Sequence, residues 1–245
     1  MTEPTRFAGR RVAVTGAAGG IGQAIVERLL SEGAEVYGLD RRGVDTLPAG
    51  AVGIEMDLGS PESVASVVAA LYADDERPVD LVNSAGIVED NVSAEDMPIE
   101  QFDAVLGVNL RGVFITCQAF GRELLARGGG AIVNIASMSG NAVVNYPQRQ
   151  SAYNTSKAAV TALTKSLSVE WSPRGVRLNA LSPGYVDTPL NYLKADMHET
   201  WKRDIVIDRF ATPAEVAGAV AFLLSDDAAY FVGSELLMDG GYSLR

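Results

Sequence analysis

The sequence predicts an α/β fold in a single domain, residues 1–245, built on a doubly wound parallel sheet of about seven strands flanked by helices. Short apolar runs, typical of buried parallel strands, alternate along the chain with longer helical patterns. A glycine-rich turn follows the first of these runs, and polar residues follow several others. No repeat, low-complexity run or linker interrupts the alternation, and 245 residues suit one large domain.

Composition and charge exclude several classes of function. The chain has 20 Lys and Arg against 31 Asp and Glu, and the net charge of −11 argues against a nucleic-acid partner. Cys117 is the single cysteine and His198 the single histidine, so we expect no disulfide, no CxxC pair and no metal site. Residues 1–9 lack the pattern of a signal peptide, and no uninterrupted apolar run reaches the ~18–20 residues of a membrane span. We therefore expect a cytoplasmic protein with no membrane partner.

The first strand and the turn after it form a candidate nucleotide site. The predicted order is strand 11–15, glycine turn 16–22, helix 23–32 and strand 35–40. The turn carries Gly16, Gly20, Ile21 and Gly22, and its glycines let backbone N–H groups approach a pyrophosphate at the positive end of the helix. The spacing differs from GxGxxG. The flanking strands and an acid 18 residues after Gly22 nevertheless favour a Rossmann-type dinucleotide site.

That acid, Asp40, favours NAD as the cofactor. A carboxylate at the end of the second strand can accept from both ribose hydroxyls, whereas a 2′-phosphate would meet like charge. Arg41 and Arg42 follow at once and could recruit that phosphate. We give Asp40 more weight, because Gly19, the residue before Gly20, offers no basic side chain.

The alternation continues to the end of the chain. The further predicted strands are 52–57, 79–83, 131–135, 176–181 and 233–239, and the further predicted helices are 61–72, 102–127, 151–171 and 214–224. Residues 141–150 form a loop and residues 190–203 a polar, irregular insert. Ligands bind at the carboxyl ends of parallel strands, so the glycine turn, Asp40, Asn83, Ser137 and Pro183 should meet at one edge of the sheet.

Tyr153 and Lys157 are a candidate acid/base pair at the start of a long helix. Residues four apart lie on one helix face, with Cβ atoms roughly 5–6 Å apart. An ammonium near a phenol favours the phenolate and lowers the tyrosine pKa from its usual value of about 10. The pattern therefore predicts a general acid/base near neutral pH.

Together these motifs resemble the short-chain dehydrogenase/reductase family in its single-domain form. The resemblance covers nearly the whole chain. It rests on motifs in the family's order: Thr15-Gly16-x-x-x-Gly20-Ile21-Gly22, Asp57, Asn83-Ser84-Ala85-Gly86, Asn109, Ser137, Tyr153-x-x-x-Lys157 and Pro183-Gly184. Ser84 replaces the more usual second asparagine, a departure that we expect to affect sheet hydrogen bonding more than catalysis.

The resemblance implies a catalytic tetrad. Tyr153 would take the substrate hydroxyl proton during oxidation, while Lys157 would lower the Tyr153 pKa and hydrogen-bond the nicotinamide ribose. Ser137 would hold and polarise the substrate oxygen. Asn109 would distort its helix and help to hold a water that links Lys157 to solvent.

The resemblance also implies a set of cofactor-binding residues. Besides Tyr153 and Lys157, these are Gly16, Gly20, Ile21 and Gly22 at the first turn, Asp40 and Arg41 after the second strand, Asp57 and Leu58 at the adenine, Asn83, Ala85 and Gly86 at the adenosine ribose, and Pro183, Gly184, Val186 and Thr188 at the nicotinamide amide.

The loop before Tyr153 indicates the substrate class. Ser137 and Tyr153 are 16 positions apart, three more than in many family members, so the extra residues lie in loop 143–150 beside the substrate pocket. The sequence here looks like that of the branch acting on sugar alcohols such as galactitol, sorbitol or arabinitol. Ser139, Asn145 and Gln150 would then join Ser137 and Tyr153 in binding substrate hydroxyls. The alternative is an ordinary polar surface loop.

We therefore predict an NAD-dependent oxidoreductase that reversibly oxidises a secondary hydroxyl of a polyol or related small carbohydrate to a ketone. The alternatives are a reductase of acyl or other small ketones with the same tetrad, and a non-catalytic NAD-binding sensor. Small and apolar positions on the Tyr153 helix, with the family's usual assembly, predict a homotetramer. Residues 188–210 are expected to form a lid, in which Met197 and Trp201 face the substrate or pin the lid in place.

Overall fold

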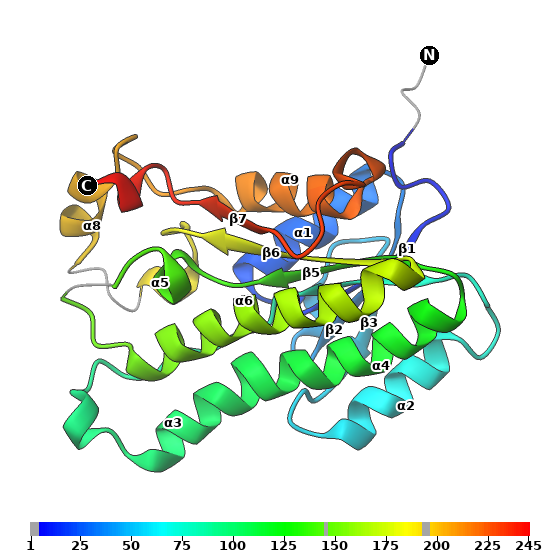
Figure 1. Cartoon of the computed structure of the whole chain (residues 1–245), viewed down its shortest axis with the longest axis horizontal. Coiled ribbons are helices and arrows are strands. Elements are labelled where there is room, and N and C mark those ends of the chain that lie inside the picture. Colours follow the sequence, from blue (N-terminus) through cyan, green and yellow to red (C-terminus); the bar gives the residue numbers. More distant parts are fainter. Residues whose placement is uncertain (1–4, 145–146, 193–196) are drawn as a thin grey trace.

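The computed structural model describes residues 5–144, 147–192 and 197–245. In this part of the chain the strands form a seven-stranded parallel sheet in the order β3-β2-β1-β4-β5-β6-β7, between two layers of helices (Figure 1). The strands are β1 Arg11–Thr15, β2 Glu35–Asp40, β3 Val52–Glu55, β4 Val79–Asn83, β5 Gly130–Ile135, β6 Val176–Pro183 and β7 Glu235–Met238. The predicted fold class is confirmed, and the strand order reverses between β1 and β4, where such sheets bind ligands.

Two helical layers bury the two faces of the sheet. Figure 1 shows α1 and α9 on one face and the remaining long helices on the other. The helices of the first layer are α1 Gly20–Ser31 and α9 Pro213–Leu224; those of the second are α2 Pro61–Leu71, α3 Ile99–Leu106, α4 Val113–Ala126 and α6 Ser151–Trp171. Each layer encloses its own apolar core, one centred on β1 with α1 and α9 and the other on β4 and β5 with α2 and α4. The central strands β1, β4, β5 and β6 are buried on both faces, which explains their largely apolar sequence, whereas the edge strands β3 and β7 are partly exposed.

Several element boundaries differ by a few residues from those that the sequence predicts, and two of these differences bear on the site. Helix α1 begins at Gly20 because Gly19 is extended and acts as the N-cap, so the end of the glycine turn is already helical. The predicted helix 102–127 begins at Ile99, and its middle, Gly107–Gly112, is a π-helix that separates α3 from α4. This π-helix contains Asn109, as expected for a residue that distorts its helix. Insertions of this kind are frequent at functional sites.

The described part of the insert between β6 and α9 forms two short helices, where the sequence predicts an irregular segment. It contains α7 Pro189–Tyr192 and α8 His198–Asp204. Trp201 is 0% exposed and stacks on Tyr185, with ring centroids 4.3 Å apart. Met138, Ile205 and Phe210 complete this cluster. Trp201 therefore pins α8 to the body of the protein, which is one of the two roles predicted for it.

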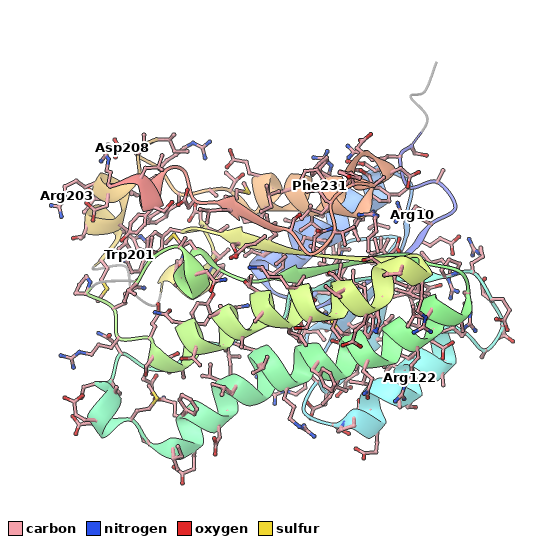
Figure 2. The ribbon with its side chains drawn as sticks, in the orientation of Figure 1. Arg10, Arg122, Trp201, Arg203, Asp208 and Phe231 are labelled. Atoms are coloured by element: carbon pink, nitrogen blue, oxygen red, sulfur yellow. The ribbon has the colours of Figure 1, made fainter. Side chains whose placement is uncertain are left out.

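The insert lies at the carboxyl ends of the strands. Figure 2 shows Trp201 at the same end of the molecule as the short helix α5, Met138–Asn141, while Arg10 lies at the opposite end. Arg203 and Asp208 carry their side chains on the outer surface of this end (Figure 2). The insert is therefore placed to cover the edge where the predicted site residues gather.

One helical run in the described part of the chain is both long and apolar. Among the described residues, Ile99–Ala126 is long and apolar enough to cross a membrane by length and composition alone. In the structure its α4 part packs against β4 and β5. Val113, Cys117, Phe120 and Leu124 of α4 belong to the second apolar core.

Candidate active site

The glycine turn after β1 brings three distant segments together. Gly16 has φ +65°, and a Cβ on it would lie 2.6 Å from the Cα of Ala85, which follows β4. A Cβ on Gly20 would lie 3.3 Å from Thr188 Cγ2, beyond the end of β6. Glycine is required at position 16 by both its backbone conformation and this close approach. The turn, the loop after β4 and the segment after β6 thus form one surface at the switch point of the sheet.

The start of α1 fits an anionic group. Its N-cap, Gly19, offers no side-chain hydrogen bond, and no acid lies in the first helical turn. Helix N–H groups without a side-chain partner carry partial positive charge and bind phosphate readily. Ile21, in the same turn, packs against the first apolar core. The residues present therefore suit the pyrophosphate of a dinucleotide.

Asp40 is fixed by the backbone around it. Its Oδ2 accepts from Ala18 N at 3.1 Å, and its Oδ1 accepts from Arg41 N at 2.7 Å. The carboxylate is therefore held beside the glycine turn, at the position predicted for the adenosine ribose. Arg41 and Arg42 are exposed. Their backbone amides, rather than their guanidinium groups, take part in holding Asp40.

The predicted adenine and ribose residues divide into two groups. Asp57 and Leu58 follow β3, and a Cβ on Gly112 of the π-helix would lie 3.1 Å from Leu58 Cβ. The side chain of Asn83, by contrast, points into the protein, with Nδ2 donating to Asn134 Oδ1 at 2.9 Å and Oδ1 accepting from Thr116 Oγ1 at 2.7 Å. Only the backbone of Asn83 is therefore available to a cofactor.

The residues expected at the nicotinamide amide continue β6 along the same edge. Pro183 ends the strand, and Gly184 N donates to Met238 O at 2.8 Å. A Cβ on Gly184 would lie 2.8 Å from Asp239 Cα, so the chain passes too close to the end of β7 for a larger residue. Val186 and Thr188 follow as buried residues, and Thr188 meets Gly20 of the glycine turn as described above.

Lys157 and Tyr153 lie on the sheet-facing side of α6. Lys157 is 4% exposed, and its Nζ donates to Ile135 O at 2.7 Å, at the end of β5. The same Nζ lies 5.6 Å from the centroid of the Tyr153 ring. A Cβ on Gly86 would lie 3.5 Å from both Lys157 Nζ and Asn109 Oδ1, so these groups converge on the loop after β4.

The pKa values at this pair differ from the expectation. Burial raises the pKa of Tyr153 and is the largest effect on it; a hydrogen bond with Ser137 lowers the pKa and the charge of Glu89 raises it further. Burial also lowers the pKa of Lys157 to about 8. The predicted lowering of the Tyr153 pKa by Lys157 is thus wrong for this structure. The reason is that Lys157 Nζ is directed to the Ile135 carbonyl and loses solvation itself.

Asn109 binds the loop after β4 with its side chain. Its Oδ1 accepts from Ile87 N, and its Nδ2 donates to Ile87 O, both at 2.9 Å. Nδ2 also donates to Ser156 Oγ at 3.1 Å. The amide is therefore engaged by protein groups, and a water beside Lys157 would have to be held by the backbone of the π-helix.

Ser137 and Ser139 form a buried pair of hydroxyls after β5. Their Oγ atoms are 2.7 Å apart, and the two residues are 7% and 4% exposed. Gln150, also predicted to bind substrate, is buried just before α6. The neighbouring Gln148 is buried as well and accepts from Tyr185 Oη at 2.8 Å. Asn145, the remaining predicted substrate residue, lies outside the described residues.

Sequence reasoning missed Glu89. This residue is 2% exposed, and its carboxylate accepts from the backbone N–H groups of Ala152 and Tyr153. Its contacts join residues 63 and 64 positions apart, so no local pattern marks them. The available signal was indirect: neither Gln150 nor the first turn of α6 offers a good capping side chain.

The potential metal ligands of the described residues, Cys117 included, form no metal-binding group. Cys117 is buried beside Asn83 and Asn134, and burial raises the pKa of its thiol to about 12. Among the described residues, no three His, Cys, Asp or Glu side chains gather as a metal-binding group. The polar groups at this edge of the sheet are thus hydroxyls, amides, one buried ammonium and carboxylates.

Comparison with known proteins assigns the chain to a family. A family model described as enoyl-(acyl carrier protein) reductase matches residues 16–243. The galactitol 2-dehydrogenase (L-tagatose-forming) of Cereibacter sphaeroides is 41% identical over 252 residues, covering 98% of this chain and 97% of that protein. The D-threitol dehydrogenase of Mycolicibacterium smegmatis is 38% identical over 251 residues, covering 98% and 95%.

A solved structure agrees with these sequence relatives. The short-chain type dehydrogenase/reductase of Mycobacterium marinum has a TM-score of 0.93 and 35% identity, and the match covers 99% of both chains. The sheet order, the glycine turn and the convergence of Tyr153, Lys157, Ser137 and Asn109 are in keeping with these matches. The chain belongs to the short-chain dehydrogenase/reductase family and is an oxidoreductase that acts on CH–OH groups with a nicotinamide cofactor.

Proposed function

We propose that the protein oxidises a secondary hydroxyl of a polyol or related small carbohydrate to a ketone, reversibly, with NAD as its cofactor. The observation that carries the substrate class is the buried Ser137–Ser139 hydroxyl pair beside the polar loop 147–150. A site lined with hydroxyls and amides binds a polyhydroxylated substrate and rejects analogues that leave its groups unpaired. The relatives named as galactitol and D-threitol dehydrogenases support this class.

Ser137 and Tyr153 would act on the substrate oxygen. Ser139 can donate its hydroxyl hydrogen to Ser137 Oγ, which leaves the Ser137 hydroxyl to donate to the substrate. Tyr153 would accept the substrate hydroxyl proton during oxidation and return it during reduction. Lys157 and Asn109 would hold Tyr153 and the loop after β4 in place around it. When bound, the nicotinamide supplies the hydride acceptor or donor.

Cofactor choice rests on Asp40. Its carboxylate is held by two backbone amides beside the glycine turn, where it can accept from the ribose hydroxyls. The same charge opposes a 2′-phosphate at that place. Arg41 and Arg42 are exposed, and their contacts with Asp40 are made by the backbone N–H groups.

We further propose a homotetramer with a lid at residues 188–210. Exposed apolar side chains on the neighbouring helices α4 and α6, Phe114 and Val169, offer surface for self-association, which light scattering would measure. The described part of the lid is attached to the body through Trp201 and Tyr185. A cytoplasmic location follows from the need for a recycled pool of NAD.

A panel of polyols tests the substrate class. With NAD and purified protein, we expect NADH absorbance to rise with C4–C6 polyols and to remain low with apolar secondary alcohols of similar size. Each polyol should be compared with its deoxy analogue, because the loss of one bound hydroxyl should lower kcat/KM by roughly tenfold or more. Oxidation of apolar alcohols alone would instead favour a reductase of acyl or other small ketones.

Replacing Tyr153 by Phe tests the acid/base. The change removes only the hydroxyl, so we expect kcat to fall by roughly 10²–10⁴-fold while NAD binding measured by calorimetry stays within about twofold. Tyr230→Phe is the matched control, because Tyr230 is 100% exposed and its change should leave the rate intact. A Tyr153→Phe protein that oxidises its substrate at the wild-type rate would show that the proton goes elsewhere.

Replacing Asp40 by Ala tests cofactor choice. Wild-type protein should prefer NAD, and the variant should shift the ratio of kcat/KM for NAD to that for NADP by about tenfold or more toward NADP. The physical reason is the simultaneous loss of a ribose acceptor and of the charge facing the phosphate. Asp45→Ala, an exposed acid a few residues later, should leave the ratio unchanged. A wild-type preference for NADP would indicate that Arg41 or Arg42 dominates.

The rate of oxidation should rise with pH. Tyr153 must be deprotonated to accept a proton, and its raised pKa keeps it protonated at neutral pH. Between about pH 7 and pH 10 we expect kcat for oxidation to increase, by at most about tenfold per pH unit, while ketone reduction does not increase. A flat or falling oxidation profile contradicts the assignment.

A further inference from the structure

The first turn of α6 lacks a cap of its own. Its N-cap residue, Gln150, makes no side-chain capping bond, and no acid lies in the first turn. The first N–H groups of a helix have no partner within the helix and need one from elsewhere. Here Glu89 supplies it, since Oε1 accepts from Ala152 N at 2.9 Å and Oε2 accepts from Tyr153 N at 3.1 Å.

The residues bound by Glu89 are those that carry the chemistry. One of the two amides belongs to Tyr153 itself, and Lys157 follows one helical turn later. Glu89 is 2% exposed, so its bonds to these amides are screened little by water. A carboxylate at a helix N-terminus is also favoured by the helix dipole.

Glu89 belongs to a loop that contacts each part of the site. The loop begins after β4, where a Cβ on Gly86 would touch both Lys157 and Asn109. Ile87 is bound through its N–H and C=O by the Asn109 side chain. Beyond Glu89, Asn91 Oδ1 accepts from Arg149 N at 3.0 Å, in the loop before α6. The loop after β4 therefore connects the π-helix, α6 and the residues just before α6.

We propose that Glu89 is a positioning residue whose buried carboxylate fixes the first turn of α6, and with it the Tyr153 hydroxyl, relative to the loop after β4. This inference rests on the proposed role of Tyr153 as the acid/base. Glu89 does not touch the substrate and acts only through the backbone that carries Tyr153. A displacement of about 1 Å at a reacting group can cost on the order of 10²-fold in rate, so such fixing matters for catalysis.

The charge of Glu89 has a second consequence. Among the described residues, Lys157 from the same helix lies 5.6 Å from the Tyr153 ring, the Glu89 carboxylate binds the Tyr153 backbone N–H, and the Ser137 hydroxyl bonds the phenol from the end of β5. The negative charge of Glu89 raises the pKa of Tyr153 and so favours the protonated phenol. Glu89 therefore suits Tyr153 to donate a proton to a ketone at neutral pH and delays oxidation to higher pH.

Two substitutions separate these effects. Glu89→Gln keeps the shape and one acceptor oxygen but removes the charge, so the midpoint of the pH profile for oxidation should shift to lower pH. Glu89→Ala removes both acceptors, so kcat should fall by roughly 10- to 100-fold while KM for NAD stays within about twofold. Asp90→Asn is the control, because Asp90 is the adjacent, exposed carboxylate and accepts from Gln101 rather than from α6. It should change neither quantity.

Hydrogen exchange tests the fixing of α6 without any substrate. In ligand-free protein, peptides covering residues 151–154 should exchange faster in Glu89→Ala than in wild type, while peptides from the α9 start, which has its own capping box, should not change. The hydrogen-exchange result therefore still tests the role of Glu89 if the polyol assay detects no activity. Unchanged exchange at 151–154 in Glu89→Ala would overturn the inference. If Glu89→Ala does not fold, exchange at 151–154 in Glu89→Gln, which loses one of the two acceptor oxygens, decides it instead.

Discussion

The hydrogen bond from Lys157 to the Ile135 carbonyl fixes α6 against the end of β5. Burying an ammonium is costly, and here a single 2.7 Å bond to a strand-end carbonyl offsets part of that cost. The bond requires α6 to lie close to the sheet, which in turn requires small residues around it. A Cβ on Gly140 would lie 2.8 Å from Ala158 N, and one on Gly86 would approach Lys157 itself. Both the position of the Lys157 ammonium and its lowered pKa follow from this packing.

The elements and their order could be predicted from the sequence largely because the central strands β1, β4, β5 and β6 are buried on both faces and therefore read as apolar runs. The convergence of Asp40, Ser137 and Pro183 on one edge follows from the parallel sheet alone. The helix distortion at Asn109, which the family resemblance implies, is present as a π-helix around that residue. In these cases the controlling interactions lie within one element or follow directly from the topology.

The remaining parts of the site depend on tertiary contacts that no short pattern records. The Asn83 side chain is turned inward by Asn134 and Thr116, partners from another strand and a helix. The Tyr153 pKa depends on burial of its hydroxyl, which cannot be inferred from the spacing to Lys157. Glu89 is a polar residue in a loop until the fold brings it to an uncapped helix. The sequence therefore predicts which groups gather at the site better than it predicts their hydrogen-bond partners, burial and pKa values.

Residues 147–150, just before α6, are attached on two sides to other parts of the protein. These attachments matter for the substrate specificity proposed above. Gln148 accepts from Tyr185, whose ring stacks on Trp201, so one side of the loop is joined to the insert. Arg149 N donates to Asn91, so the other side is joined to the loop after β4. A polar pocket discriminates well only when its groups cannot relax to satisfy one another after a poor substrate binds. These two attachments restrict that relaxation, so in the proposed function the buried polar residues before Tyr153 would select for substrate hydroxyls rather than merely tolerate them.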